Sequence, residues 1–361
     1  MGETWDVVVL GAGGAGMMCA ATAAKRGRKT LALDHGDRLG KKILISGGGR
    51  CNFTNIGAAP RNYFSSNEHF AKSAMARYRP EEFVKLVEKY GILYYEKKLG
   101  QLFCTDSAQR IVDLLEGECR EAGAEIRLKT KIVDVTPLAR EGDAGPRYRI
   151  TTETGEIFAE SVVVATGGPS VPKIGATDFG QRLAARLGLD VTPLDAALVS
   201  LAMDQKFTGR FGGLSGVSVD TEVSVGSQKF RENLLFTHTG LSGPVILQVS
   251  LHWFPGEKIR INLSPDRSME SHLMGAKREG SQKLVRNVFG EFFTERLTEK
   301  LCEEFEIPST PIAQTADATL RKIAERTHRW ELIPAANGGY GKAEVTRGGV
   351  NTDELSSRSL E

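Results

Sequence analysis

Three stretches of the chain combine residue types that can bind a nucleotide cofactor or move a proton. Gly11–Gly16 follows the pattern G-x-G-x-x-G, and Asp34 ends the apolar run that comes next. Ser46–Asn52 sets three consecutive glycines between a serine and an Arg-Cys-Asn sequence, and His238 lies among small and hydroxyl residues. Glycines let backbone N–H groups approach phosphate, a carboxylate accepts hydrogen bonds from ribose hydroxyls, and an imidazole exchanges protons.

The elements around Gly11–Gly16 give the glycine pattern its meaning. An apolar run, Trp5–Leu10, precedes it, a helical pattern over 14–26 follows it, and a second apolar run leads to Asp34. This order predicts the βα turn that holds a dinucleotide pyrophosphate at a helix N-terminus. An ordinary βαβ turn with a solvated Asp34 is the alternative. The predicted cofactor-binding residues are Gly11 for the tight turn, Gly13 for approach to the phosphates, Gly14 and Ala15 at the helix start, Gly16 for helix packing, and Asp34 on the adenosine ribose.

The glycine run in Ser46–Asn52 disfavours any regular element and predicts positive φ or close approach to a ligand. Backbone N–H groups, a hydroxyl and an amide could hold a diphosphate or a flavin ring, with an arginine to balance charge. A mobile surface loop is the alternative. The predicted contacts are Ser46, Gly47, Gly48, Gly49, Arg50, Cys51 and Asn52. We expect Cys51 to pack as a small buried residue rather than act as a nucleophile, because no His or Asp partner lies at a recognisable spacing.

A further cofactor segment is predicted where the apolar strand 162–164 runs into Ala165, Thr166, Gly167 and Gly168. After a first dinucleotide fingerprint, such an ending is typical of two-dinucleotide flavoproteins, in which it closes the crevice around the cofactor. A core strand that ends in a turn is a compatible alternative. Another predicted strand, over 125–135, adds Val133 to the residues that hold the ADP half.

His238 is the candidate catalytic residue. It precedes Ser242, which is predicted to cap a helix that begins near Pro244. We expect His238 to face the flavin as an acid or hydrogen-bond donor toward the substrate. A capped helix with a hydrogen-bonding histidine is the structural alternative. Residues 240–243 do not form a G-x-S-x-G elbow, so the sequence gives no support to serine hydrolase chemistry.

The order of the patterns predicts an α/β fold. Strand and helix patterns alternate over the first 190 residues, which favours a sheet with helices on its faces. Short strand patterns with glycine-rich turns then fill 191–265, helical patterns fill 268–330, and a strand pattern resumes at 343–350. We therefore predict a dinucleotide-binding domain over 1–190, an inserted substrate-side domain over 191–342, and a return strand to the first domain over 343–361.

Composition narrows the protein class. The 361 residues carry a net charge of +2, and no apolar run is long enough for a membrane span. The five cysteines are scattered, which favours reduced thiols in a cytoplasmic protein, and neither they nor the six histidines show metal-ligand spacing. We expect no metal, no nucleic-acid partner and no membrane partner. The sequence does not indicate an oligomeric state.

With these motifs assembled, the chain resembles the bacterial YhiN/BaiN-like FAD-binding flavoproteins, also called aminoacetone-oxidase-like. The resemblance implies a two-dinucleotide (Rossmann-like) FAD-binding domain with an inserted β-barrel-plus-helices domain, and it adds Lys42 to the cofactor-binding residues. Some such proteins are linked to reducing ring-conjugated double bonds in bile-acid-like steroids, and others to amine oxidation. The matching stretches, in family order, are Gly11–Gly16, Lys42–Asn52, Ala165–Gly168 with Ser170 and Pro172, Phe236–Pro244 and Val345–Val350.

One departure from the family concerns the end of the chain. In such proteins a segment of about 40–50 residues follows the Gly-Gly-Val strand and completes the isoalloxazine pocket. This length comes from the family resemblance, and the length of the chain alone would not predict it. This sequence stops at Glu361. We therefore expect a fragment that binds FAD weakly and exposes an apolar sheet face near Val345–Val350.

These observations predict an FAD-dependent oxidoreductase. Its small organic substrate would lie between the flavin and the inserted domain, and the reaction would be reduction of a conjugated C=C bond or amine oxidation. The chain has a single G-x-G-x-x-G, so NAD(P)H would bind transiently as an electron donor at the flavin face. The alternative is a non-catalytic flavin- or nucleotide-binding module acting on RNA or a protein partner. The near-neutral charge and the lack of basic–aromatic stripes weigh against nucleic acid.

Overall fold

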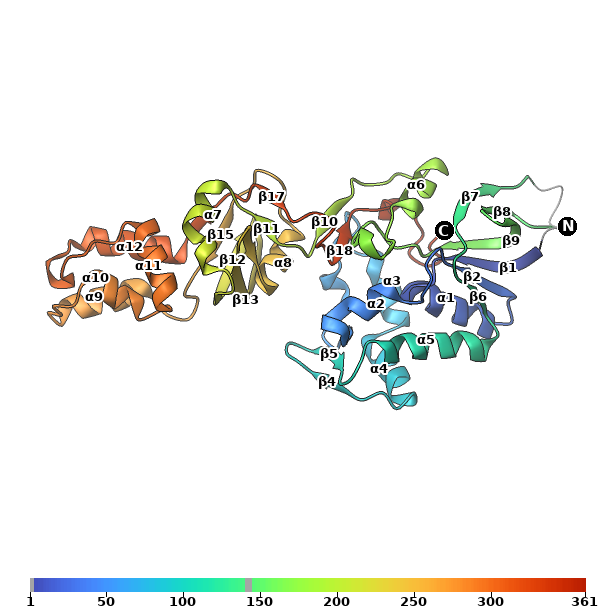
Figure 1. Cartoon of the computed structure of the whole chain (residues 1–361), viewed down its shortest axis with the longest axis horizontal. Coiled ribbons are helices and arrows are strands. Elements are labelled where there is room, and N and C mark those ends of the chain that lie inside the picture. Colours follow the sequence, from blue (N-terminus) through green and yellow to red (C-terminus); the bar gives the residue numbers. More distant parts are fainter. Residues whose placement is uncertain (1–2, 140–144) are drawn as a thin grey trace. The chain divides into compact units, whose positions relative to one another are not determined.

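The computed structural model describes residues 3–139 and 145–361 and divides the chain into two compact units (Figure 1). Unit 1 takes in the chain up to Pro193 together with Gly348–Glu361, and unit 2 is Leu194–Arg347. The strand that we expected to return to the first domain forms inside unit 2 instead, and the chain re-enters unit 1 only at Gly348. Val345 and Val350 are both half-buried, so the expected exposed apolar face is not found there.

Unit 1 is built on a six-stranded sheet in the order β6-β2-β1-β9-β8-β7. Strands β6, β2, β1 and β9 are parallel, and β8 and β7 continue the sheet as an antiparallel meander. The single strand predicted over 125–135 is wrong: the segment forms two strands, β6 and β7, at opposite edges of the sheet, with residues 128–131 between them. The strands are β1 (Glu3–Leu10), β2 (Thr30–Leu33), β6 (Glu125–Arg127), β7 (Ile132–Pro137), β8 (Tyr148–Thr152) and β9 (Gly155–Val164).

Apolar side chains alternate between the two faces of this sheet. Val9 and Ala32 face a core that contains residues of α1 and α5, whereas Val8 and Leu31 face a core closed by α6 and the meander. Burial on both faces is typical of parallel sheets. The helices of unit 1 are α1 (Gly14–Lys25), α2 (Lys41–Ile45), α3 (Phe70–Arg77), α4 (Pro80–Lys89), α5 (Gln109–Ala122) and α6 (Phe179–Arg186), with 3-10 turns η1 (Ser46–Gly49), η2 (Pro60–Asn62), η3 (Pro172–Ile174) and η6 (Thr352–Glu354).

A second, three-stranded sheet in unit 1 has the order β3-β5-β4 and is antiparallel. Its strands are β3 (Asn52–Asn55), β4 (Tyr94–Glu96) and β5 (Gln101–Cys104), and β4 and β5 form the hairpin at the lower edge of unit 1 in Figure 1. One face of this sheet packs Phe53, Tyr94 and Cys104 into the core shared with α1 and α5. The sheet therefore extends the core directly after the 46–52 segment.

Unit 2 combines a seven-stranded antiparallel sheet, in the order β16-β15-β12-β13-β14-β11-β17, with a group of helices. One apolar core joins the sheet to the helices around Phe211, Phe289 and Trp330. The sheet strands are β11 (Leu201–Ala202), β12 (Ser218–Val225), β13 (Gln228–Thr237), β14 (Gly240–Ser242), β15 (Ile259–Asn262), β16 (Trp330–Leu332) and β17 (Ala336–Asn337), and β10 (Asp195–Ala197) pairs with β18 (Val345–Arg347). The helices are α7 (Gln205–Phe211), α8 (Pro244–Ser250), α9 (Met269–Arg278), α10 (Val285–Gly290), α11 (Glu295–Phe305) and α12 (Asp317–His328), with 3-10 turns η4 (Gly212–Leu214) and η5 (Ile312–Gln314).

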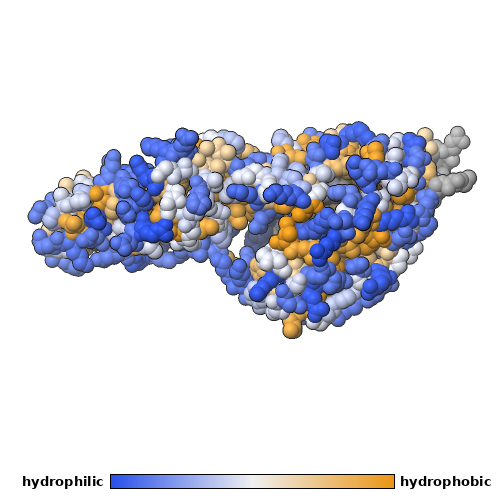
Figure 2. Space-filling model, in the orientation of Figure 1, coloured by the Kyte–Doolittle hydropathy of each residue, from blue (hydrophilic) through white to orange (hydrophobic). Residues whose placement is uncertain are grey.

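The surfaces of the two units differ in hydropathy on the face drawn in Figure 2. Hydrophobic residues gather over parts of unit 1, whereas the helical end of unit 2 is covered mainly by hydrophilic residues. Within residues 3–139 and 145–361, no helix is both long and apolar enough to cross a membrane. The same residues contain no group of three or more His, Cys, Asp or Glu side chains that could hold a metal ion.

Glu118 on α5 is a buried carboxylate that joins two helices of unit 1. It is 3% exposed, forms an ion pair with Lys25, lies 2.9 Å from Lys89 Nζ, and accepts a hydrogen bond of 2.9 Å from the Tyr90 hydroxyl. Burial alone would raise the pKa of Glu118, but the hydrogen bonds from Lys25, Lys89 and Tyr90 outweigh burial and lower this pKa to about 2. A folded-state pKa below 4.5 means that the ionised carboxylate stabilises the fold above pH 4.5.

Acid should therefore remove this contribution, and Glu118→Gln should remove it at every pH. We expect the free energy of unfolding to fall by about 2–3 kcal/mol as the pH drops from the unfolded to the folded pKa of Glu118. Glu118→Gln should lower the free energy of unfolding by a similar amount at pH 7. It should also make this free energy nearly independent of pH between the two pKa values, as urea titrations at several pH values would measure. Glu121→Gln is the matched control, because Glu121 is exposed and lies 3.8 Å from Lys89. An equal fall in the free energy of unfolding with decreasing pH in wild type and Glu118→Gln would contradict the assignment.

Candidate cofactor-binding site

The carboxyl ends of three parallel strands bring the predicted segments together. Leu10 of β1 stands opposite both Leu33 of β2 and Val164 of β9, so the three strands end in one row. The residues that follow them are Gly11, Asp34 and Ala165, which therefore share one edge of the sheet. In doubly wound sheets this edge is where ligands bind.

The glycine turn has the geometry that a dinucleotide fingerprint needs. Gly11 has φ +103°, and a Cβ there would lie 2.6 Å from the carbonyl oxygen of Ala165. A Cβ at Gly16 would overlap the carbonyl oxygen of Gly11, so only glycine lets α1 pack this closely against the turn. In contrast, a Cβ at Gly13 would meet nothing within 4 Å. Gly13 is the N-cap of α1, and the space in front of it adjoins the positive end of that helix.

Asp34 links the end of β2 to this glycine turn. Its carboxylate accepts hydrogen bonds from the backbone N–H groups of Ala12 at 2.8 Å and Gly36 at 2.7 Å. The carbonyl oxygen of Asp34 accepts a hydrogen bond of 2.9 Å from the Thr130 N–H, which holds the segment after β6 at the same edge. The side chain is 22% exposed. Asp34 is therefore fixed in place while part of its carboxylate remains accessible to a ligand.

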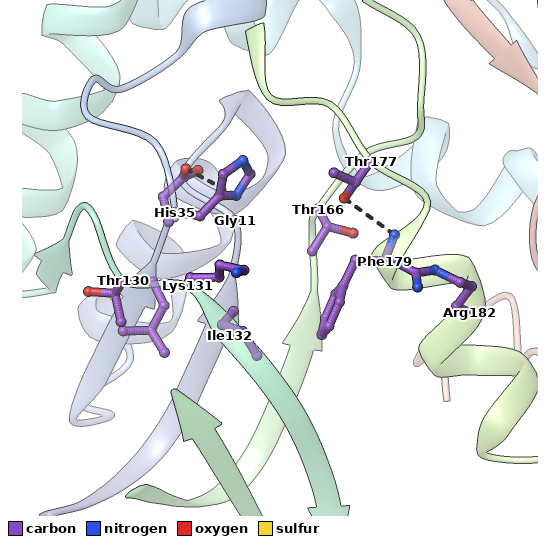
Figure 3. Close-up of a pocket in the computed structure, with 11 residues that line it drawn as sticks. Gly11, His35, Thr130, Lys131, Ile132, Thr166, Thr177, Phe179 and Arg182 are labelled. Atoms are coloured by element: carbon purple, nitrogen blue, oxygen red, sulfur yellow. Dashed lines mark hydrogen bonds and ion pairs between the residues drawn. The ribbon is translucent and has the colours of Figure 1, made fainter. Parts of the chain in front are cut away.

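These residues border a cavity of about 200 Å³, seen in Figure 3. Thr130, Lys131 and Ile132 lie on one side, and Thr166, Thr177, Phe179 and Arg182 lie on the other. Two apolar side chains, Ile132 and Phe179, and several polar groups thus share one concave surface, which is typical of small-molecule and cofactor sites. The cavity is lined by Gly11, Leu33, Asp34, His35, Thr130, Lys131, Ile132, Thr166, Thr177, Phe179 and Arg182.

The cavity wall offers a polar atom that a ligand could satisfy. Thr166 Oγ1 is buried and has no hydrogen-bond partner among the residues that the structure describes. Buried polar groups are normally paired, so an unpaired hydroxyl beside a cavity suggests a missing partner. Together with the open space before Gly13, this hydroxyl fits the bound dinucleotide that the sequence predicts.

The Ser46–Asn52 segment forms a tight turn rather than a loose loop. Gly47, Gly48 and Gly49 have φ values of +57°, +68° and +84°, as the glycine run predicted. The turn is held by backbone hydrogen bonds from Cys51 to Ser46 and from Ala108 to Gly49. Ser46 Oγ donates to the Ile43 carbonyl at 2.7 Å, so this hydroxyl already has a partner within the chain.

The side chains of this turn point in different directions. Cys51 is 5% exposed and packs in the core, in line with the packing role predicted for it. Arg50 and Asn52 are exposed, and Lys42 is exposed on α2. Their contacts with a cofactor stay predictions.

Several other predicted residues lie outside the cavity. Val133 is 55% exposed on β7, next to the cavity residue Ile132. Gly167 accepts a hydrogen bond of 3.0 Å from Gln181 Nε2, and Gly168 follows it in the turn after β9. His238 is exposed in the turn between β13 and β14 of unit 2, with no hydrogen bond or ion pair to the described residues. The predicted cap by Ser242 is wrong, because Gly243 is the N-cap of α8 and no side chain caps that helix.

Sequence reasoning missed most of the cavity wall, since only Gly11, Asp34 and Thr166 of its lining were predicted site residues. His35 follows Asp34 directly and donates a hydrogen bond from Nε2 to the Gly175 carbonyl at 2.9 Å. Phe179 and Arg182 come from α6, whose pattern carried no chemical motif. The position of His35 beside a predicted ribose ligand was the one available signal, because adjacent residues at a strand end share its edge.

The parallel sheet, the glycine turn and the carboxylate at the carboxyl edge together define a Rossmann-type dinucleotide-binding protein of the α/β class. The family model described as "HI0933-like protein Rossmann domain" matches residues 5–361, and the chain belongs to this family. The predicted resemblance and fold class are confirmed. Membership of this family and similarity to a reductase place the chain among flavoprotein oxidoreductases.

Three curated relatives match nearly the whole chain. Proteins named "Ribosomal RNA dihydrouridine synthase" from Escherichia coli (strain K12) and Haemophilus influenzae (strain ATCC 51907 / DSM 11121 / KW20 / Rd) are 41% and 37% identical over 360 and 363 residues. These matches cover 99% and 100% of this chain and 88% and 90% of the two relatives. A "3-dehydro-bile acid delta(4,6)-reductase" from Clostridium scindens (strain ATCC 35704 / DSM 5676 / VPI 13733 / 19) is 25% identical over 374 residues, covering 98% of this chain and 88% of that protein.

These relatives contradict the prediction that no nucleic acid is involved. Two proteins so similar to this chain are named for a reaction on ribosomal RNA. The prediction rested on a net charge of +2 and on the absence of basic–aromatic stripes along the sequence. Net charge is an average over the whole surface, and it does not report a local cluster built from distant segments.

Asp34→Asn tests the ribose contact without changing the shape of the side chain. The amide keeps one oxygen for a backbone N–H, but its NH₂ group opposes the other N–H and cannot accept from a ribose hydroxyl. We expect FAD binding to weaken by about 1–3 kcal/mol, measured by fluorescence titration. Asp37→Asn is the matched control, because Asp37 is exposed and pairs with Lys41 outside the cavity wall. An unchanged FAD affinity in Asp34→Asn would remove Asp34 from the site.

Proposed function

We propose that the protein is an FAD-dependent reductase that converts a uridine of ribosomal RNA into dihydrouridine. The observation that carries this proposal is 41% identity, over 99% of the chain, to a protein named for that product. The name of the steroid relative supports the same kind of chemistry, because it also denotes hydrogen addition to ring C=C bonds. Reduction of a conjugated C=C bond was one of the two reactions that the sequence predicted.

The cavity of unit 1 supports a binding mode for FAD. The ADP half would occupy the cavity with its ribose on Asp34, and the diphosphate would lie at Gly13 before the N-terminus of α1. The backbone of the turn Ser46–Asn52 would hold the flavin end. Reduced FAD, when bound, would supply the hydride, because amino-acid side chains cannot donate one. A reduced nicotinamide nucleotide is the proposed donor, bound transiently because the sequence contains a single G-x-G-x-x-G.

Saturation of the uracil ring needs a hydride at one carbon of the C5=C6 bond and a proton at the other. The chain must therefore place an acid near the ring, and His238 is the residue that we propose for it. The exposed position of His238 and its lack of a hydrogen bond to the described residues leave its imidazole available to an incoming ligand. An imidazole can donate a proton near neutral pH.

The test starts from purified protein supplied with excess FAD. Its visible spectrum is recorded before and after anaerobic NADH or NADPH, and the reduced protein is then given ribosomal RNA that lacks dihydrouridine. Nucleoside mass spectrometry should detect dihydrouridine in proportion to flavin reoxidation. A parallel reaction contains a bile-acid steroid with a conjugated ring ketone. Reoxidation by the steroid without any dihydrouridine in RNA would overturn the proposal in favour of a small-molecule reductase.

A further inference from the structure

The three-stranded sheet of unit 1 has a second face, opposite the one that packs Phe53, Tyr94 and Cys104 against α1 and α5. Phe103 of β5 stands opposite Asn52 of β3 and Tyr95 of β4. Directly opposed residues of antiparallel strands project from the same face of a sheet. Lys97 follows two residues after Tyr95, and Arg50 precedes Asn52 by two. We call these five residues, Arg50, Asn52, Tyr95, Lys97 and Phe103, the aromatic–basic face.

Contacts within the aromatic–basic face order its side chains. The rings of Tyr95 and Phe103 stack with centroids 6.0 Å apart and an angle of 26° between planes. Lys97 Nζ lies 5.4 Å from the centroid of Phe103, and Arg50 Nη1 donates to the Tyr95 hydroxyl at 3.5 Å. Phe103 is buried at 6% exposure, whereas Tyr95 is half-buried and both cations are exposed. Phe103 thus forms a base for the half-buried Tyr95 ring, with Arg50 at the tyrosine hydroxyl and Lys97 against the phenylalanine ring.

The two cations of this face are not neutralised by carboxylates. In residues 3–139 and 145–361, neither Arg50 nor Lys97 has an ion-pair partner. On nearby helix α4, in contrast, Lys85 lies 2.8 Å from Glu82 and Lys89 lies 2.9 Å from Glu118. Exposed lysine and arginine side chains that lack carboxylate partners are the groups that neutralise the phosphates of a nucleic-acid backbone.

The aromatic–basic face adjoins the segment that we assign to the flavin. A Cβ at Gly47 would lie 2.8 Å from Cε1 of Phe103, so the ring packs directly on the glycine turn. The Cys104 N–H donates to the Arg50 carbonyl at 2.9 Å, which ties β5 to the end of the same turn. A polymer bound along this face would therefore pass beside the 46–52 segment.

We propose that the aromatic–basic face binds the single-stranded RNA that flanks the target uridine, with one base stacked on Tyr95 and phosphates on Arg50 and Lys97. The inference rests on the proposed function and adds to it the place where the RNA strand is held. Enzymes that act on a base require it outside a helical stack, and bases of unpaired RNA stack readily on aromatic side chains. Arginine and lysine beside such a ring are typical of single-strand binding surfaces.

The experiment measures binding of a fluorescent single-stranded RNA oligonucleotide to the FAD-loaded protein by anisotropy at several salt concentrations. Tyr95→Ala should weaken binding roughly 5- to 150-fold, and Tyr95→Phe should retain it because the ring still stacks. Lys97→Ala should weaken binding and lower the slope of log affinity against log salt by about 0.7. Tyr78→Ala and Lys85→Ala are the matched controls, because both residues are exposed in unit 1 but lie beside acidic side chains.

Flavin content and thermal unfolding of each variant show whether a substitution changed the fold or only the surface. Lys97→Ala is the variant least expected to disturb the fold, because the Lys97 side chain is exposed. Wild-type affinity in both Tyr95→Ala and Lys97→Ala, or no RNA binding by wild type, would overturn the inference. Dihydrouridine formation is assayed on the same proteins. If Tyr95→Ala and Lys97→Ala bind RNA normally and form dihydrouridine as wild type does, this inference alone is wrong. If these variants lose RNA binding while the controls keep it, but the wild-type protein forms no dihydrouridine, the proposed function alone is wrong.

Discussion

Gly13→Ala is expected to weaken FAD binding while leaving the fold as stable as wild type. The new methyl group would meet no protein atom within 4 Å, and the backbone at Gly13, with φ −79° and ψ −172°, suits any residue. A diphosphate bound before α1 would occupy that space. The methyl group would then clash with the ligand alone, at an expected cost of about 1–3 kcal/mol, typical of overpacking. FAD titration and thermal unfolding of the FAD-free protein measure the two effects separately.

Gly16→Ala provides the opposite pattern as a control. Its Cβ would overlap the carbonyl oxygen of Gly11, so the fold itself should be destabilised with no ligand present. A variant that loses FAD only because it unfolds would resemble Gly16→Ala in the unfolding experiment. Full FAD affinity in Gly13→Ala would show that the diphosphate does not approach this turn.

Local patterns predicted the elements of the cofactor edge because their signals lie close together in the chain. The helix predicted over 14–26 is α1, Gly14–Lys25, and it ends before Gly27, which has φ +78°. The row formed by Leu10, Leu33 and Val164 follows from parallel pairing of three apolar runs. Gly11, Asp34 and Thr166 consequently line one cavity, as a dinucleotide fold requires.

The features that escaped prediction depend on tertiary contacts. The segment 125–135 is apolar enough for one strand, but residues 128–131 leave the sheet between β6 and β7, where the Thr130 N–H donates to the Asp34 carbonyl. Phe179 reaches the cavity from a helix with no chemical motif. Arg50, Tyr95 and Lys97 form a cluster only because β3, β5 and β4 pair across the sequence. No window of the sequence contains that cluster, so a search along the sequence for basic–aromatic stripes could not find it.

His238→Ala is expected to slow substrate reduction far more than it changes FAD binding or stability. The side chain is exposed in a hairpin turn and makes no hydrogen bond to the described residues, so its removal should leave unit 2 intact. If His238 supplies the proton for ring saturation, its loss should reduce the rate roughly 10²- to 10⁴-fold, the usual contribution of a general acid. The measurement is reoxidation of the reduced flavin by RNA substrate under anaerobic conditions, followed in the flavin absorption band.

The reduction of the flavin by the nicotinamide donor is the internal reference for this variant. That step involves no proton transfer to the uracil ring, so His238→Ala should leave its rate unchanged. His69→Ala is the matched control, since His69 is also exposed but lies in unit 1. Slowing confined to the reoxidation step, and absent from His69→Ala, is the expected result. Equal reoxidation rates in wild type and His238→Ala would assign His238 to the hairpin turn alone and require a proton donor from elsewhere in the chain.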